Sequence, residues 1–135
     1  MREILFRGKR VDNGEWVYGS FIPDLCELLY GNKLDGFIKP FGKTRKERLM
    51  VEVDRKTVGQ YTGLRDKNST RIFEADIVKV YDVYCNETVV GVVEFCDGSF
   101  RIYDKDFTSY DRWMYCKVEV IGNVFDNPEL LEGEQ

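Results

Sequence analysis

The chain has 135 residues, of which 43% are hydrophobic and 33% are charged, and it carries a formal net charge of −4. This balance is ordinary for a globular protein, no run of about 18 apolar residues could span a membrane, and the acidic charge argues against a bulk nucleic-acid binder. A chain of this length can bury a core without disulfide or metal staples, so we expect one compact domain or two small packed subdomains.

In the N-terminal half, alternating apolar residues predict strands near residues 3–11 and 15–22. Asn13-Gly14 lies between them, and this pair supplies the positive φ angles of a tight hairpin turn. Residues 24–30 fit either one or two helical turns or a strand, and turns follow them. A strand at 36–41 is predicted to lie at a sheet edge, because Pro40 lacks the N–H that an inner strand donates.

Alternation is clearer further along the chain, and Gly91 is a candidate bulge within it. Asp97-Gly98 predicts a second hairpin, and Gly122 a bend in the last strand. Asn127 and Pro128 favour a short helix, with Asn127 as its cap. Further strands are expected at 49–53, 57–61, 77–84, 88–95, 99–103 and 113–125.

Short strands joined by tight turns indicate a mainly β fold. Four or five strands between residues 76 and 125 suit a small SH3-like barrel. A piece that small is marginally stable alone. We therefore expect an N-terminal β-rich subdomain at 1–56, containing the hairpin, to pack on an SH3-like barrel subdomain at 57–135 that ends in the short helix.

Three blocks of sequence carry a resemblance to a known family: MREILFR at 1–7, TVGQYTGLRDKNSTRIFEADIVKV at 57–80 and EVIGNVFDNPELL at 119–131. Together they cover about a third of the chain, and they resemble the YopX family of small phage and prophage proteins. The resemblance implies a mainly β fold with an SH3-like barrel, a phage or prophage origin, the cytoplasm of a bacterial host and self-assembly. It implies no activity.

Two residues depart from the family pattern in the middle block. Ser69 stands where the family has glycine, and a positive-φ turn there would strain it by roughly 1 kcal/mol. Ala75 also replaces a family glycine, and we expect an ordinary backbone conformation for it.

The middle block itself is interpreted as architectural. Residues 57–64 form a strand, 65–71 a polar turn, Ile72 and Phe73 return to the core, and Asp76 binds backbone amides. The alternative is a recognition loop at residues 65–68.

Catalytic chemistry finds little support. The chain has no histidine, no nucleotide-binding glycine motif and no nucleophile elbow, so we expect no enzyme, cofactor or metal site. Two carboxylate clusters could bind a divalent cation, but residues 104–111 lack calcium-loop spacing and are interpreted as a solvated loop. The four cysteines form no C-x-x-C pair and are expected to be buried free thiols in a reducing cytoplasm. The first carboxylate cluster is Asp66, Glu74 and Asp76, and the second is Asp104, Asp106 and Asp111. The cysteines are Cys26, Cys85, Cys96 and Cys116.

Two surface features remain. The first is a basic run beside Phe37 and Phe41, which is either a solvated loop or a nucleic-acid contact made by Lys43, Arg45, Lys46 and Arg48, next to Lys39. The second is an aromatic group, Phe107, Tyr110 and Trp113, which either belongs to the core or covers the barrel mouth, or forms an interface or ligand platform.

Charge is also uneven along the chain. Residues 1–56 carry 12 basic and 9 acidic side chains, whereas residues 57–135 carry 8 and 15. Opposite net charges allow one half to dock on the other, within or between chains. The leading hypothesis is therefore a non-enzymatic, self-associating β module of a phage or prophage, acting in the host cytoplasm through protein contacts and not through a membrane. The alternative is a small-barrel nucleic-acid-binding protein that uses the basic segment 39–48.

Overall fold

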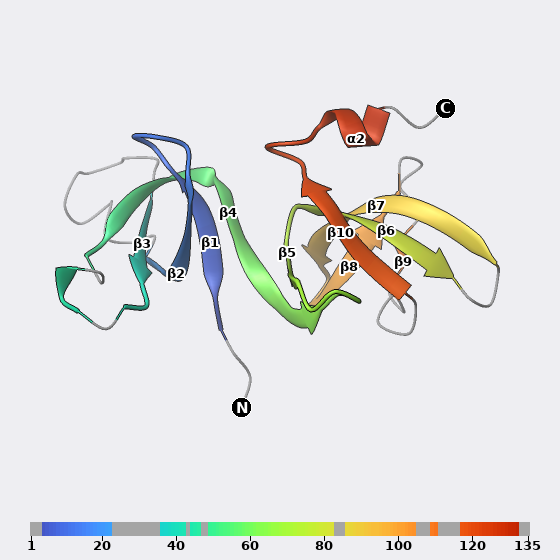
Figure 1. Ribbon diagram of the computed structural model, residues 1–135, viewed down its shortest axis with the longest axis horizontal. Helices are drawn as coiled ribbons and strands as arrows, with labels where there is room; N and C mark the ends of the chain where they lie inside the picture. The colour runs from blue at the N-terminus through green and yellow to red at the C-terminus, as the bar shows by residue number, and fades with distance from the viewer. Residues whose placement is uncertain are drawn as a thin grey trace. The chain divides into compact units, whose positions relative to one another are not determined.

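A computed structural model describes residues 4–22, 36–42, 44–46, 49–82, 86–104, 109–110 and 117–132. Within these residues the chain is mainly β, as expected, and it forms two five-stranded sheets (Figure 1). The chain divides into two compact units, Met1–Tyr61 and Thr62–Gln135, which we call unit 1 and unit 2. The division falls inside strand β4 (Val51–Arg65), which also contains residue 56, the expected boundary.

Unit 1 begins with the predicted hairpin. Strands β1 (Phe6–Arg10) and β2 (Trp16–Ile22) pair antiparallel, with Lys9 opposite Trp16. The Arg10 N–H donates to the Glu15 carbonyl at 2.9 Å, so residues 11–14 form the loop. Positive φ is adopted at Gly14 (75°) and not at Asn13. The hairpin is confirmed, but its loop is longer than the two-residue turn that Asn-Gly favours.

The strands of unit 1 close into a ring. Strand β3 (Gly36–Pro40) pairs with β2 on one side and with β4 on the other, and β4 also pairs with β1. The prediction that Pro40 marks an edge strand is therefore wrong. Pro40 is tolerated because pairing with β4 covers only residues 36–38, so its missing N–H falls beyond that ladder.

Strand β4 also corrects the prediction of two separate strands at 49–53 and 57–61. It runs without a break from Val51 to Arg65, and its register against β1 shifts in the middle. The polar residues between the two predicted strands form a bulge within β4 and not a turn. Buried apolar residues of unit 1 are Leu5, Ile38, Val53 and Tyr61.

Unit 2 has a sheet in the order β10-β6-β7-β8-β9, in which neighbouring strands are antiparallel (Figure 1). Asp97 and Gly98 join β7 to β8 with φ of 51° and 83°, as a two-residue hairpin turn of this type requires. The second predicted hairpin is thus confirmed. The strands are β5 (Arg71–Phe73), β6 (Asp76–Asp82), β7 (Glu87–Cys96), β8 (Ser99–Tyr103), β9 (Ser109–Tyr110) and β10 (Lys117–Asn123).

Two glycines of unit 2 have different roles. Gly91 is not a bulge, because the ladder of β7 with β6 passes through it, opposite Val78, without a register shift. A Cβ at Gly91 would lie 2.6 Å from Ile102 Cγ2 and 2.8 Å from the Tyr103 carbonyl oxygen, so the residue allows a close approach of β8. The bulge lies at the predicted bend instead, between Val120 and Gly122.

The core of unit 2 is a continuous apolar cluster, with Leu64, Phe100 and Val120 packed against it. Burying side chains of this size contributes about 1.5 to 3 kcal/mol each. Its members are Ile72, Val78, Val80, Val93, Ile102 and Val118.

The short helix predicted after Pro128 is present as α2 (Glu129–Glu132). The Asn127 side chain was expected to cap this helix. Its Oδ1 instead accepts the N–H of Asn123 at 3.2 Å. No helix within the described residues has the length and apolar character needed to cross a membrane. The predictions for residues 24–35 lie outside the described residues.

Candidate functional site

The middle block, 57–80, is built around two buried carboxylates. Asp66 Oδ1 accepts the N–H groups of Asn68 (2.8 Å) and Thr70 (2.9 Å). Asp66 Oδ2 accepts the N–H of Val120 at 2.9 Å. Burial alone would raise the pKa of Asp66, but these three backbone donors, helped by Lys67, lower it below its usual value. This carboxylate is committed to the fold.

The second carboxylate, Asp76, is 2% exposed and accepts the N–H of Phe73 at 2.7 Å, as expected. Ile72 and Phe73 are buried, which also agrees with the architectural interpretation. Ser69 adopts the positive φ foreseen for it, 68°. The expectation for Ala75 is wrong, because its φ is 73°, in the left-handed region that favours glycine.

Other predicted sites are only partly within the described chain. The described residues contain no group of three acidic or cysteine side chains placed to hold a metal ion. Cys96 is a free, half-buried thiol. Tyr110 lies in β9 with its backbone paired to Ile102. The remaining predicted site residues, Cys26, Cys85, Asp106, Phe107, Asp111, Trp113 and Cys116, lie outside the described residues.

The basic segment is also described in part. Lys39, Arg45 and Lys46 are exposed, whereas Lys43 and Arg48 lie outside the described residues. Three exposed apolar side chains flank the segment: Phe41 is 63% exposed, Leu49 60% and Met50 47%. Phe41 directly follows β3, and the other two directly precede β4, the strand with which β3 pairs. We call these three residues the apolar end of unit 1.

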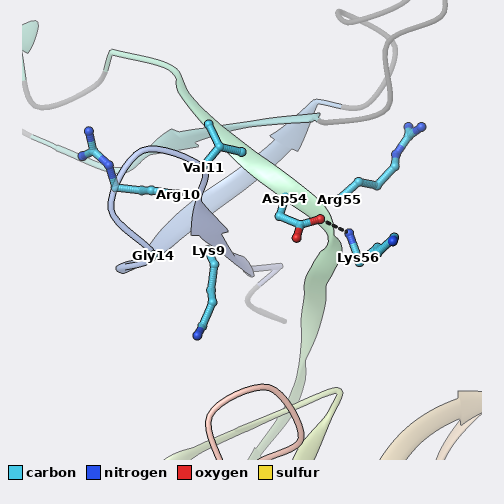
Figure 2. Close-up of a pocket in the computed structure, with 7 residues that line it drawn as sticks. All are labelled: Lys9, Arg10, Val11, Gly14, Asp54, Arg55 and Lys56. Atoms are coloured by element: carbon cyan, nitrogen blue, oxygen red, sulfur yellow. Dashed lines mark hydrogen bonds between the residues drawn. The ribbon is translucent and has the colours of Figure 1, made fainter.

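A depression of about 680 Å³ lies on unit 1. We call it the basic depression. Four of its lining side chains are cationic and one is a carboxylate. The lining residues are Lys9, Arg10, Val11, Gly14, Asp54, Arg55 and Lys56 (Figure 2).

The bulge in β4 positions one wall of the basic depression. Arg7 is opposite Gly59 and Lys9 is opposite Asp54, so five steps along β4 match two along β1. Thr57 fills the gap in the ladder: its Oγ1 accepts the Lys9 N–H at 2.8 Å and donates to the Asp54 carbonyl at 2.6 Å. The bulge thereby turns Arg55 and Lys56 outward, where both are exposed.

The cations of the basic depression are held in different ways. Arg10 is tied to Asp12 by two hydrogen bonds of 2.9 and 2.8 Å. That pairing raises the pKa of Arg10 and lowers the pKa of Asp12. Lys9 Nζ lies 5.5 Å from the centroid of the Trp16 ring, on which the Arg7 guanidinium also lies, at 4.5 Å.

The side chains around the basic depression diverge. Figure 2 shows Lys9 and Arg10 pointing away from each other and from Arg55 and Lys56. Asp54 lies between the two walls, and its Oδ1 accepts the Lys56 N–H at 3.0 Å. The cationic side chains thus spread around the depression and do not aim several donors at one point.

Sequence analysis did not identify this site. Its residues come from two short segments, 9–14 and 54–56, and only the pairing of β1 with β4 brings them together. The local signal was a pair of basic residues in each segment, Lys9-Arg10 and Arg55-Lys56.

Comparisons with known proteins agree with the fold and the resemblance. The family model described as YopX protein matches residues 5–132. The SPbeta prophage-derived uncharacterized protein YopX of Bacillus subtilis (strain 168) is 38% identical over 68 residues, which are 46% of this chain and 51% of that protein. The sequence match thus spans about half the length of that relative.

Two crystal structures share the fold. Protein EF1440 from Enterococcus faecalis has a TM-score of 0.58 at 24% identity, covering 97% of this chain and 99% of that one. Protein yopX from Bacillus subtilis has a TM-score of 0.59 at 22% identity and covers both chains completely. Because the family model matches almost the whole chain, the protein belongs to the YopX protein family.

Proposed function

We propose that the protein is a non-enzymatic phage or prophage module that self-associates and acts through protein contacts in the cytoplasm of its bacterial host. The observation that carries this proposal is the apolar end of unit 1. Phe41, Leu49 and Met50 expose 63%, 60% and 47% of their surface. Large apolar side chains grouped in this way are typical of a surface that a protein partner covers.

The occupant proposed for the apolar end is a second copy of the chain. Unit 1 belongs to the half of the chain with a basic surplus, and unit 2 to the half with an acidic surplus. Electrostatic attraction between unlike halves of two copies would bring the copies together, and apolar burial would hold them.

Light scattering coupled to size-exclusion chromatography tests self-association. The wild-type chain is expected to have the mass of an oligomer, and a variant with Phe41→Ser, Leu49→Ser and Met50→Ser the mass of a monomer or smaller assembly. Tyr18→Ser is the matched control, because Tyr18 is a 46% exposed apolar residue outside the apolar end. A wild-type chain that stays monomeric at high concentration would rule the proposal out.

Nucleic-acid binding through the basic segment is the second candidate. Lys39, Arg45 and Lys46 are exposed next to the exposed ring of Phe41, a combination that suits phosphate contact and base stacking. The proposal assigns contacts to Lys43, Arg45, Lys46 and Arg48. Binding that is sensitive to salt and lost when these four become Ala supports it, and binding that survives the replacement contradicts it.

Within this proposal unit 2 has the form of an SH3-like barrel, with the N-terminal subdomain packed on it, and Phe107, Tyr110 and Trp113 contribute to its interface. The five antiparallel strands β6 to β10 support the barrel form. A crystal structure in which the sheet closes through β5 or β9 would establish it, and an open sheet would exclude it.

A further inference from the structure

The basic depression is a surface that neither the apolar end nor the basic segment includes. We propose that it binds the phosphodiester backbone of a nucleic acid without reading the bases. This proposal is independent of self-association and uses different residues from the segment 39–48.

Charge is the first argument. The rim carries Lys9, Arg10, Arg55 and Lys56, and Asp54 is the one carboxylate in the lining. Asp12 already neutralises Arg10, as a salt bridge of 2.8 Å. Within the described part of the chain, neither Arg55 nor Lys56 takes part in an ion pair. Arg55 and Lys56 are therefore exposed cations beside a hollow lined by one carboxylate, with Lys9 half-buried against Trp16 on the other wall, although the whole chain is acidic.

Geometry decides which anion fits. A compact anion such as inorganic phosphate is held by donors that converge on one point. In Figure 2 the cations spread outward around the rim. A polyanion matches that spread, since duplex DNA carries a charge every 1.7 Å or so along its axis. An extended phosphate chain can meet Lys9 at one wall and Arg55 and Lys56 at the other.

Pre-organisation is the second argument for a binding surface. Thr57 ties the backbone of Lys9 to the bulge that carries Arg55 and Lys56. The two walls are therefore fixed to each other by a bond of 2.8 Å and do not have to be assembled on binding. A surface already in place loses less conformational entropy when a ligand arrives.

The lining also predicts what the site does not recognise. Its seven residues include no aromatic ring and no amide side chain that could stack on a base or pair with its edge. Phosphate contacts position a nucleic acid but carry no sequence information. We expect binding that is independent of base sequence and strongly dependent on salt.

Fluorescence anisotropy of the full chain with labelled DNA tests the proposal. The probes are a single strand of mixed sequence and a duplex, each of about 20 nucleotides per strand, titrated between about 50 and 200 mM salt. The test variant carries Lys9→Gln, Arg55→Gln and Lys56→Gln. The control carries Lys67→Gln, Lys79→Gln and Lys117→Gln, which removes the same charge from three exposed lysines of unit 2.

The wild type and the control are expected to bind with similar salt dependence. The test variant is expected to reduce the slope of log K against log salt by about 2 to 3, since each lost phosphate contact contributes about 0.7 to 0.9. Thermal melting of both variants verifies that they fold. Comparing the single strand with the duplex then identifies which form the site prefers.

Four results would overturn the proposal. The first is that the wild type binds no DNA at the lowest salt. The second is that the test and control variants lose DNA affinity equally. The third is that a variant with Arg45→Gln and Lys46→Gln loses DNA binding while the test variant binds normally. The fourth is binding to vesicles of phosphatidylcholine with phosphatidylserine in the absence of DNA binding, which would make the surface specific for anionic lipid.

Discussion

The Asp66 carboxylate accepts a hydrogen bond from the backbone N–H of Val120, 2.9 Å away and 54 positions along the chain. Its other oxygen binds the N–H groups of Asn68 and Thr70, in the turn between β4 and β5. One buried side chain thus closes a local turn and fixes a distant strand. Val120 lies at the bulge of β10, where the ladder to β6 is interrupted, so Asp66 satisfies an N–H at an irregular position of the sheet.

Replacing Asp66 with Asn should destabilise unit 2. The amide keeps one acceptor oxygen and loses the charge, so all three backbone donors lose a charged partner and at least one loses its acceptor. Bonds to charged groups contribute about 1.5 to 3 kcal/mol, and we expect a loss of about 2 to 4 kcal/mol in the free energy of unfolding by urea. Asp97→Asn, at an exposed turn, should change it by less than about 0.5 kcal/mol. Equal effects of the two variants would contradict this role.

Acid should remove the same contribution. The pKa of Asp66 is lowered in the folded chain, so the carboxylate stabilises the fold fully above its unfolded value of about 3.9. That stability is lost as pH falls from about 4 toward the folded pKa. The difference in unfolding free energy between wild type and Asp66→Asn should therefore shrink below about pH 4 and be constant above about pH 5. A difference that grows in acid would refute the assignment.

Two left-handed residues offer a route to higher stability. Ser69 and Ala75 have φ of 68° and 73°, which costs a residue with a Cβ about 1 to 2 kcal/mol relative to glycine. Ser69→Gly and Ala75→Gly should each raise the free energy of unfolding by about 1 kcal/mol, as measured in urea. Asp97→Gly, at φ 51°, is the control and should gain less, because Asp tolerates this region.

Gly91 should resist substitution for a different reason. In Gly91→Ala the new methyl group would meet Ile102 and the carbonyl oxygen of Tyr103 at less than 3 Å, and a backbone atom cannot move aside cheaply. We expect a loss of about 2 to 3 kcal/mol by thermal or urea unfolding. Gly98→Ala meets no atom within 4 Å and should cost only the strain of its φ, about 1 to 2 kcal/mol. The reverse order would show that β8 can shift.

Thr57 should be needed for its oxygen and not for its methyl group. Thr57→Val leaves the Lys9 N–H without the acceptor that it now has, at a cost of about 1 to 3 kcal/mol. Thr57→Ser keeps the oxygen and should lose much less. Amide hydrogen exchange at Lys9 reports directly on this hydrogen bond, because the exchange rate should increase in the Thr57→Val variant only. Similar exchange in both variants would mean that Oγ1 does not hold the bulge.

Several features could be predicted because the residues that determine them lie close together in the sequence. Asp97-Gly98 specifies a two-residue turn through its backbone preferences, and Asp76 finds the N–H of Phe73 only three positions away. Ile72 and Phe73 were expected in the core as the apolar pair after the polar turn, and both are buried. Ala75 was mispredicted because residue type states only a preference, which the surrounding sheet overrides.

The rest depended on strands that are far apart in the sequence. Pairing of β1 with β4 closes the ring of unit 1 and brings residues 9–14 beside 54–56 to form the basic depression, and pairing of β3 with β4 removes the edge expected at Pro40. The sequence alone determined a β fold, its hairpins and its family. Tertiary structure decided the ring, the bond of Asp66 to Val120 and the basic depression, because register between distant strands is set by the packing of all of them together.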